Sequence, residues 1–394
     1  MSEDPIVIAG IGRTPMGGFQ GELASMKATE LGGVAVAKAI GEAGIAPEDF
    51  DECVMGCVLP AGLGQAPARQ AGIAGGLPVS VGATTVNKMC GSGMKAVMQS
   101  HDMIAAGAAD IIVAGGLESM TNAPYLLPKA REGLRMGHGE VKDHMFVDGL
   151  EDFNDNRLMG TYAEATAQRY QFTREQQDDF AINSLKRAQT ANEDGTFARE
   201  IAPVTIKTRK GETVIATDEQ PRNADLDKIP NLRPAFAKDG TVTAANSSSI
   251  SDGAAALVLM RRSEAEKRGV TPLATIVGQA TFAQEPAWFT TAPVGAVQRL
   301  FDKTGWSKDD VDLFEINEAF AVVPMAVMHD LGVGHDILNV HGGACALGHP
   351  VGASGARILV TLLGAMEKHN LKRGVAGICL GGGEATAMAI ERAA

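Results

Sequence analysis

Short apolar runs alternate with longer stretches of small and apolar residues over the first 120 residues. A brief continuous apolar run is typical of a buried strand, and a longer stretch without turn signals is typical of a helix. The longer stretches predict helices at 29–43 and 94–106. The short runs predict strands at 5–10, 52–59, 83–87 and 110–114. Strands that alternate with helices indicate an α/β fold with a mostly parallel sheet, covered on both faces.

The far end of the chain repeats this order. The same pattern predicts helices at 319–331 and 356–368, and strands at 311–316, 337–340, 375–379 and 385–391. We therefore expect two α/β halves of similar topology. The first half comprises residues 1–120 with 245–270, and the second comprises residues 271–394.

The middle segment, residues 121–244, is more polar and has long irregular stretches on either side of two helices predicted within 161–193. A long insertion of this kind is often a functional cap or a binding loop. We expect it to form a loop domain beside the functional site.

Composition narrows the class of protein. The 394 residues are 45% hydrophobic, enough for large buried cores, and their net charge is -12. Such an acidic chain argues against nucleic acid or an anionic membrane as the main partner. No run of 18 uncharged apolar residues suggests a membrane span, and no secretory signal is visible, so we expect a cytoplasmic protein.

Five cysteines without a secretory signal indicate reduced thiols. Cys53 and Cys57 have a C-x3-C spacing, but no second Cys or His pair lies nearby in the sequence. We interpret them as core residues of a strand and expect no metal site.

Cys90 stands between a predicted strand and a predicted helix, with Gly91 and Gly93 beside it. The glycines permit a strained turn that exposes the sulfur, and a helix N-terminus lowers the pKa of a thiol. These features favour a nucleophile. A buried core cysteine is the alternative, and the local sequence does not decide between them.

Two further residues occupy glycine-rich turns. His349 precedes Pro350 in the segment 342–350, where it can act as a general base toward a thiol or merely pack against its own loop. Cys379 ends the strand predicted at 375–379 and precedes three glycines, whose N–H groups are free to donate to an oxyanion. A core cysteine at a strand end is again the alternative.

Taken together, these segments resemble the signature motifs of the thiolase family. The motifs are VNKMCGSGMKAV at 86–97, NEAFA at 317–321, GGACALGHPVGASGAR at 342–357 and CLGGG at 379–383. AGGLESM at 114–120 and TAANSSSISDGAA at 243–255 extend the resemblance over essentially the whole chain. The resemblance implies two mixed five-stranded sheets layered with helices, plus a loop domain.

The resemblance also implies roles for site residues. Cys90 resembles the nucleophile that carries the acyl group, His349 the base that deprotonates it, and Cys379 the second acid/base. Asn317 resembles the residue that holds a water in an oxyanion hole, with His349 as the other donor. The N–H groups of Cys90 and Gly381 resemble the second oxyanion hole.

Contacts with coenzyme A are implied in the same way. Ser248 resembles the residue that hydrogen-bonds the pantetheine arm, and Arg222 is the candidate for the phosphates. The remaining residues expected to contact the acyl-CoA are Met159, Leu150, Phe236, Ala319 and Phe320. The chain departs from many short-chain members in having Leu158 where they have His, and Pro221 where potassium-dependent relatives have Tyr.

The resemblance is strongest to short-chain, biosynthetic-type members. It implies the reversible condensation of two acetyl-CoA to acetoacetyl-CoA and CoA, with acyl-CoA and CoA as substrates and no other cofactor. A broader-chain degradative thiolase, a decarboxylating ketoacyl synthase and a non-catalytic acyl-CoA carrier are the alternatives. A homo-oligomer, a tetramer built from two dimers, is also implied, with 121–145 as the segment that joins the dimers.

Overall fold

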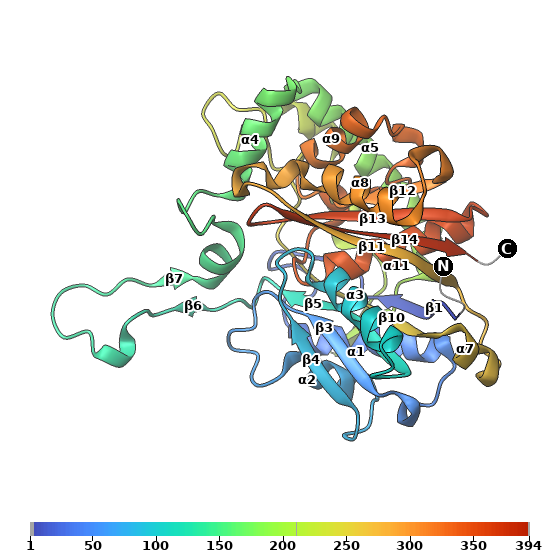
Figure 1. Ribbon diagram of the computed structural model, residues 1–394. Coiled ribbons are helices and arrows are strands. Elements are labelled where there is room, and N and C mark those ends of the chain that lie inside the picture. Colours follow the sequence, from blue (N-terminus) through green and yellow to red (C-terminus); the bar gives the residue numbers. More distant parts are fainter. Residues whose placement is uncertain (1–3, 210, 393–394) are drawn as a thin grey trace.

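The computed structural model describes residues 4–209 and 211–392. Its main feature is one long mixed sheet (Figure 1). The strands follow the order β12 (Leu313–Ile316), β13 (Arg373–Leu380), β14 (Glu384–Arg392), β11 (Ala274–Ala283), β1 (Ile6–Arg13), β10 (Ser251–Arg261), β5 (Ile111–Ser119), β3 (Glu52–Gly56) and β4 (Gly82–Val86), and β2 (Gly17–Gly18) pairs with β10.

The sheet divides naturally into two halves where β1 meets β11. That junction is short, with only Val7 opposite Thr275 and Ile8 opposite Ala274. Strands β1, β10, β5, β3 and β4 form the N-terminal side, and β11 to β14 form the C-terminal side. The layered two-half α/β fold implied by the resemblance is confirmed.

Strand directions differ from the expectation of a mostly parallel sheet. Only the pairs β3–β4, β3–β5 and β12–β13 are parallel. Strands β10, β11 and β14 run antiparallel to their neighbours. The prediction of a mostly parallel sheet was wrong because β10 and β11 were not predicted as strands, and because β13 and β14 are joined by a tight turn rather than a helix.

One predicted strand is nearly absent. Residues 337–340 contribute a single bridge, between Phe314 and Leu338, and the 3-10 helix η8 (His335–Ile337) takes the start of that segment. Arg187 donates to the carbonyls of His335, Leu338 and Asn339, so these backbone groups are satisfied by a side chain rather than by a strand partner.

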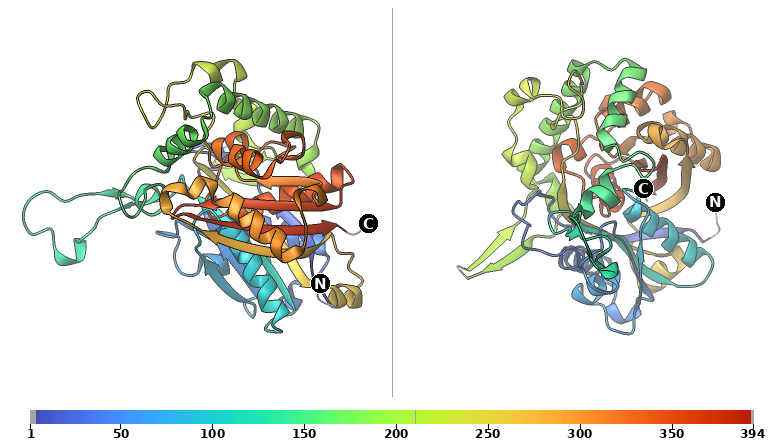
Figure 2. Two further views of the ribbon diagram at one scale, coloured as in Figure 1. Left: turned by 45° about the horizontal axis from the view of Figure 1, so that its top comes forward. Right: turned by 90° about the vertical axis from the view of Figure 1, so that its left-hand side faces the viewer.

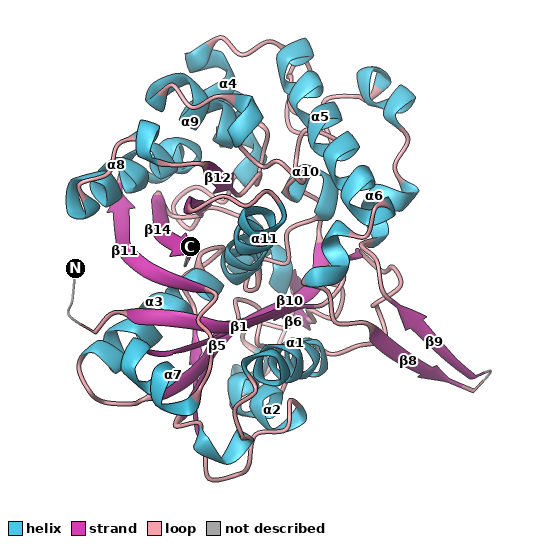
Figure 3. Ribbon diagram, turned by 90° about the vertical axis from the view of Figure 1, so that its right-hand side faces the viewer, coloured by secondary structure: helices cyan, strands magenta, loops and turns pink. Residues whose placement is uncertain are grey.

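Helices cover both outer faces of the sheet and fill the space between its two halves. On the N-terminal side lie α1 (Ala28–Ala43), α2 (Pro67–Ala74) and α7 (Arg262–Arg268), and on the C-terminal side lie α8 (Ala292–Thr304) and α9 (Val322–Leu331). The central layer consists of α3 (Ser92–Ala105) and α11 (Ser354–Lys368), and Figure 3 shows α11 enclosed between β12 and β14 on one side and β1 and β10 on the other.

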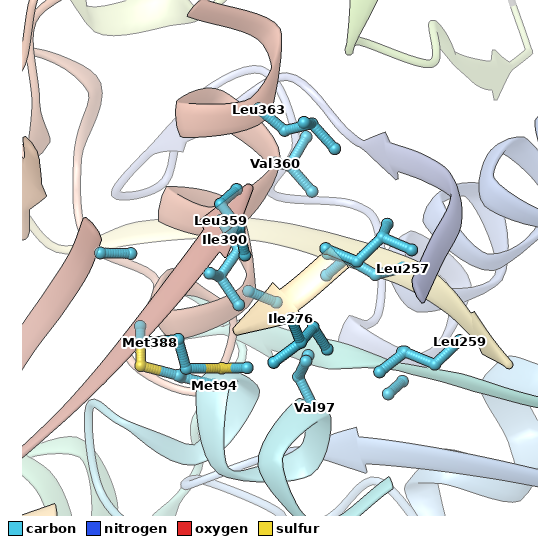
Figure 4. Packing of buried hydrophobic residues seen from close by; sticks show 14 of the residues in the cluster. Met94, Val97, Leu257, Leu259, Ile276, Leu359, Val360, Leu363, Met388 and Ile390 are labelled. Atoms are coloured by element: carbon cyan, nitrogen blue, oxygen red, sulfur yellow. The ribbon is translucent and has the colours of Figure 1, made fainter. Parts of the chain in front are cut away.

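The central layer forms the principal core. Residues 354–366 of α11 are all buried, because both faces of this helix pack against protein. Val97 and Met94 of α3 meet Leu257 of β10, Ile276 of β11 and Leu359 of α11 in one apolar cluster (Figure 4). This packing fixes the start of α3 and the start of α11 relative to each other.

The middle segment is largely irregular, as expected. It holds α4 (Met159–Tyr170), α5 (Arg174–Glu193) and α6 (Glu219–Asn223), and α5 begins with a capping box between Thr173 and Gln176. Two hairpins project from the body, β6 (Tyr125–Leu126) with β7 (Lys142–Asp143) and β8 (Val204–Thr208) with β9 (Gly211–Ile215) (Figure 2).

The remaining helical segments are short. They are α10 (Ala344–Leu347), the π-helix η3 (Phe146–Leu150), and the 3-10 helices η1 (Pro47–Asp49), η2 (Ala130–Glu132), η4 (Thr196–Arg199), η5 (Leu226–Asn231), η6 (Pro286–Thr291) and η7 (Lys308–Asp310). Among the helices of the described residues, none has the length and apolar character needed to span a membrane.

Candidate active site

An apolar cavity of about 360 Å³ opens where the two halves and the middle segment meet. Of the residues expected at the site, it is lined by Cys90, His349, Gly381, Ser248, Met159, Leu150, Phe236, Ala319 and Phe320. Sequence analysis also singled out Leu158, which lines it too. Lining residues that were not anticipated include Phe146, Ile250, Phe289 and Val351, and they carry no sequence signal beyond their apolar character.

The turn that presents Cys90 is strained at Met89 rather than at a glycine. Met89 has φ 46°, in the left-handed region, whereas Gly91 has φ -84°. Ser92 holds the turn, since its hydroxyl accepts from the amide of Lys88 at 2.8 Å and donates to the carbonyl of Met89 at 2.6 Å. Strain of this kind at a non-glycine residue is a feature of functional turns.

The two glycines serve close packing instead. A Cβ on Gly93 would lie 2.8 Å from the backbone nitrogen of Ala356, so Gly93 lets α3 approach α11 closely. A Cβ on Gly91 would lie 2.8 Å from the Leu380 side chain, next to Cys379. Glycine at these positions therefore brings the Cys90 turn against the segments that carry the other candidate residues.

Burial sets the protonation state of Cys90. Removal of the partly buried thiol from water raises its pKa to about 11, although backbone hydrogen bonds from Gly381 and from Cys90 itself act in the opposite direction. The expectation that the helix start lowers this pKa is wrong, because α3 begins only at Ser92 and desolvation outweighs the amide dipoles. The resting group is a thiol, which needs a base before it can attack.

His349 supplies such a base. Its side chain is buried, and burial, with the nearby charge of Arg357, lowers its pKa to about 3, so the imidazole is neutral. Nδ1 lies 2.6 Å from the Ser354 hydroxyl, while Nε2 has no hydrogen-bond partner among the residues that the structure describes. A neutral imidazole with one free nitrogen facing the cavity can accept a proton from a thiol.

The backbone of His349 is also held. Its amide donates to the carbonyl of Ser249 at 3.1 Å and to the hydroxyl of Ser251 at 3.2 Å. Gly348 before it has φ 100° and approaches Ser251 so closely that a Cβ there would lie 2.1 Å from its hydroxyl oxygen. Glycine is therefore required at this point of the turn.

Cys379 and Asn317 lie just outside the cavity lining. Cys379, at the end of β13, is fully buried, and burial followed by the charge of Cys90 raises its pKa well above the ordinary range. Gly91, next to Cys90, packs against Leu380, next to Cys379, so the two cysteines lie on adjoining turns. Asn317 follows β12 and is fully buried, and its Oδ1 lies 3.4 Å from a guanidinium nitrogen of Arg357.

Arg222 is not brought to this cavity. It lies on α6, is about half exposed, and forms an ion pair of 2.6 Å with Glu22. Its neighbours Gln220 and Asn223 line a second cavity of about 260 Å³, which shares Ala244 with the first. The contact with the CoA phosphates that was proposed from the sequence would therefore lie beside this second cavity and not beside Cys90.

Sequence analysis missed Glu118, a fully buried carboxylate at the end of β5. It accepts hydrogen bonds from the amides of Val58 at 2.9 Å, Leu59 at 3.2 Å and Gly352 at 2.9 Å. Burial raises its pKa to about 7. The available signal in the sequence was a charged residue inside the mostly apolar segment AGGLESM. A charged residue is rarely buried without partners.

Within residues 4–209 and 211–392, no three His, Cys, Asp or Glu side chains lie together in a way that could hold a metal ion. An ion pair between Lys88 and Glu384 links the Cys90 turn to the glycine-rich turn after Cys379. The site is thus an assembly of thiols, an imidazole, an amide and backbone N–H groups around an apolar cavity.

Comparisons with known proteins agree with this arrangement. Residues 6–263 match the model of the thiolase N-terminal domain, and residues 270–392 match that of the thiolase C-terminal domain. An acetyl-CoA acetyltransferase of Allochromatium vinosum is 48% identical over 98% of this chain and 99% of its own length. Acetyl-CoA acetyltransferase 2 of Arabidopsis thaliana is 50% identical, over 98% of this chain and 96% of its own.

Solved structures give the same answer. The crystal structure of the Bacillus anthracis acetyl-CoA acetyltransferase superposes with a TM-score of 0.96 at 39% sequence identity, covering 99% of each chain. Two family domains in order, near-complete coverage and a shared fold leave one conclusion: the chain belongs to the thiolase family.

Proposed function

We propose that this protein is an acetyl-CoA C-acetyltransferase, which condenses two acetyl-CoA to acetoacetyl-CoA and CoA and runs the thiolysis in reverse. The observation that carries the proposal is the meeting of Cys90, His349 and Gly381 at one apolar cavity, with Cys379 and Asn317 beside it. The names of its full-length relatives support the same activity.

In the first half-reaction, Nε2 of His349 takes the proton of Cys90, and the thiolate attacks the thioester carbonyl of acetyl-CoA. The amides of Cys90 and Gly381, which converge on the sulfur, stabilise the oxyanion. The tetrahedral intermediate collapses with loss of the CoA thiolate, which takes the proton from His349. The products are acetyl-Cys90 and free CoA, so protons balance.

In the second half-reaction, His349 takes the proton of the buried Cys379 thiol, and the resulting thiolate takes a proton from the methyl carbon of another acetyl-CoA. The resulting enolate oxygen is stabilised by His349 and by the Asn317 amide, acting through a water. The enolate carbon attacks acetyl-Cys90 and expels the Cys90 thiolate. The Cys90 thiolate takes the proton held by His349, and Cys379 keeps the proton from the methyl carbon, so both thiols are restored.

The substrate contacts follow from the cavity lining. Met159 and Leu150 bound it from the middle segment, and Ala319 and Phe320 bound it from the turn after β12. Phe236 packs against Phe320 with ring centroids 6.0 Å apart. We propose that Ser248 contacts the pantetheine arm, and that Arg222 meets the CoA phosphates after releasing Glu22.

The proposal extends to organisation. Residues 121–244 act as the loop domain that covers the site, between an N-terminal half of 1–120 with 245–270 and a C-terminal half of 271–394. The protein is a homotetramer of the cytoplasm, where its thiols stay reduced. Exposed Tyr125, Leu127 and Met136 on the β6–β7 hairpin support the oligomer.

The decisive test locates the covalent intermediate. After incubation with acetyl-CoA, mass spectrometry is expected to find the acetyl group on the Cys90 peptide, and Cys90→Ser is expected to remove it. Cys379→Ser should still acetylate Cys90 but should not cleave acetoacetyl-CoA with free CoA, followed by the absorbance of its enolate. An acetyl group on Cys379 alone, or no acetyl group on the wild-type enzyme, would overturn the proposal.

A further inference from the structure

Two polar side chains of the proposed site, His349 and Asn317, each have one unpartnered atom and are held at their other end by the same helix. Nε2 of His349 and Nδ2 of Asn317 are buried and have no hydrogen-bond partner within the described residues. The opposite atoms, Nδ1 of His349 and Oδ1 of Asn317, contact Ser354 and Arg357. Both partners lie in the first turn of α11.

Ser354 selects the form of the imidazole. Its hydroxyl oxygen lies 2.6 Å from Nδ1 of His349 and 3.0 Å from the carbonyl of Pro350, which can only accept. A single hydroxyl proton satisfies both contacts in one arrangement only, in which it goes to Pro350 and Nδ1 carries a proton that it donates to Ser354. Nε2 is then left as the bare acceptor that a base requires.

Arg357 selects the orientation of the Asn317 amide. A guanidinium has no acceptor, so the amide atom facing it must be Oδ1, and Nδ2 must point away as a donor. Arg357 is itself fixed by a 2.9 Å ion pair with Glu315, and both side chains are buried. Glu315 and Asn317 are two residues apart around the end of β12, which puts them on the same side of the strand, facing α11.

We propose that Ser354 and Arg357 are positioning residues, and that the first turn of α11 sets both the proton-accepting nitrogen of His349 and the hydrogen-bond-donating amide of Asn317. Their three-residue spacing places both side chains on one face of the helix. The inference rests on the proposed function, because it assigns those two atoms to the reaction. It adds residues that touch neither substrate nor the reacting atoms.

Ser354 is expected to affect both half-reactions, and Arg357 only the step that makes or breaks the carbon–carbon bond. Ser354 acts through His349, which serves both steps, so Ser354→Ala should slow Cys90 acetylation and condensation alike, by roughly ten- to a hundredfold in kcat with little change in KM. Arg357 acts through Asn317, whose oxygen partner is the enolate. Arg357→Lys, which keeps the charge beside Glu315 but cannot span to Asn317, should slow condensation and thiolysis while acetylation of Cys90 proceeds.

A matched control separates positioning from stability. Ser100 in α3 is fully buried, and its hydroxyl donates to the carbonyl of Ala96 at 2.8 Å, as Ser354 does to Pro350. Ser100→Ala should lower Tm about as much as Ser354→Ala but leave both half-reactions at wild-type rate. Ser354→Thr, which keeps a hydroxyl, should recover part of the lost rate.

Nitrogen NMR of the enzyme with isotope-labelled histidine reports the tautomer of His349, which does not depend on the stability of the fold. The His349 signals, identified by their loss in His349→Ala, should show a protonated Nδ1 and a bare Nε2, and Ser354→Ala should mix the two tautomers. Equal rates in Ser354→Ala and Ser100→Ala, or acetylation slowed as much as condensation in Arg357→Lys, would overturn the inference. Wild-type enzyme that neither acetylates Cys90 nor cleaves acetoacetyl-CoA would instead refute the proposed function.

Discussion

Desolvation sets the protonation states of the side chains around the cavity. Burial raises the pKa of Cys90 and of Cys379 and lowers that of His349, so the nucleophile rests as a thiol and the base rests neutral. A neutral pair of this kind costs less to bury than a thiolate–imidazolium pair. Charge then appears only when substrate arrives, next to donors already in place.

A buried histidine outside the site offers a test of the same physics through stability. Burial, followed by the charge of His369, lowers the pKa of His341 from 6.5 to about 4. Between these values the unfolded chain binds a proton that the native protein does not, so the free energy of unfolding falls as the pH falls, by about 1.4 kcal/mol per pH unit. In denaturant titrations at pH 5 and 6, the free energy of unfolding of His341→Gln should depend less steeply on pH than that of the wild type, by that amount. An equal pH dependence of the unfolding free energy in the variant and the wild type would contradict this prediction.

We expect one flexible side chain, that of Met159, to limit the length of the acyl chain beside Cys90. Met159 lines the cavity where a longer acyl chain would extend. Met159→Ala should raise kcat/KM for 3-ketoacyl-CoA with one or two more carbons relative to acetoacetyl-CoA, by roughly tenfold or more, since each methylene is worth about 1–3 kcal/mol. Met103, which packs against the core away from the cavity, gives the control Met103→Ala with unchanged selectivity. A wild-type preference for long chains would assign the enzyme to the degradative class.

At the scale of the secondary structure elements, β5 ends in a carboxylate that connects two segments next to the cavity. Glu118 joins the loop after β3 to the turn after His349, through the amides of Val58, Leu59 and Gly352. Each carboxylate oxygen accepts at least one amide, so a Gln side chain would turn its NH₂ group toward a donor.

Glu118→Gln is therefore expected to lower the free energy of unfolding by about 1–3 kcal/mol and to reduce kcat as the His349 turn shifts. Asp51 accepts from the amides of Asp110 and Ile111 at the start of the same strand, at the other end of the sheet from the cavity. Asp51→Asn should lower stability while kcat per folded enzyme is kept. Urea denaturation and steady-state kinetics on both variants test this, and an equal loss of kcat in the two would count against the role of Glu118.

Elements whose pattern is local could be predicted from the sequence. The helix predicted at 29–43 is α1, the strand predicted at 83–87 is β4, and the helix predicted at 356–368 is α11, with ends that differ by one or two residues. Strands β10 and β11 were missed. Apolar residues run continuously through 254–260 of β10, and nothing in its local sequence shows that β1 and β5 lie on either side of it.

Most of the residues expected at the site line one cavity, whereas the pKa of Cys90 differs from the expectation. A motif fixes the order of residues, but the pKa of Cys90 depends on burial and on groups from other segments, including the Gly381 amide and the Glu118 carboxylate. Arg222 could not be placed from sequence for a related reason, since its partner Glu22 is distant in the chain.

At the scale of the whole molecule, the β6–β7 hairpin stands away from the body (Figure 1). Its exposed apolar side chains include Leu127, Leu134, Met136 and Val141. Replacing these four by serine should convert the proposed tetramer into dimers, because the apolar contact between dimers would be lost. Light scattering at micromolar concentration measures the change, and a monomeric wild-type protein would refute the oligomer.

Strand β1 lies in the middle of the sheet although it is the earliest strand in the described chain. Both of its neighbours, β10 and β11, are synthesised after more than half of the chain, as the pairing of Arg13 with Ala255 illustrates. A ribosome adds about 5–20 residues per second, so this mostly apolar segment waits on the order of ten seconds or more for a partner. During that interval IVIAGIGR is an unpaired, low-charge strand of the kind that aggregates. Recovery of soluble protein in the cell should therefore depend on chaperone capacity and on translation speed, even where the finished enzyme is stable.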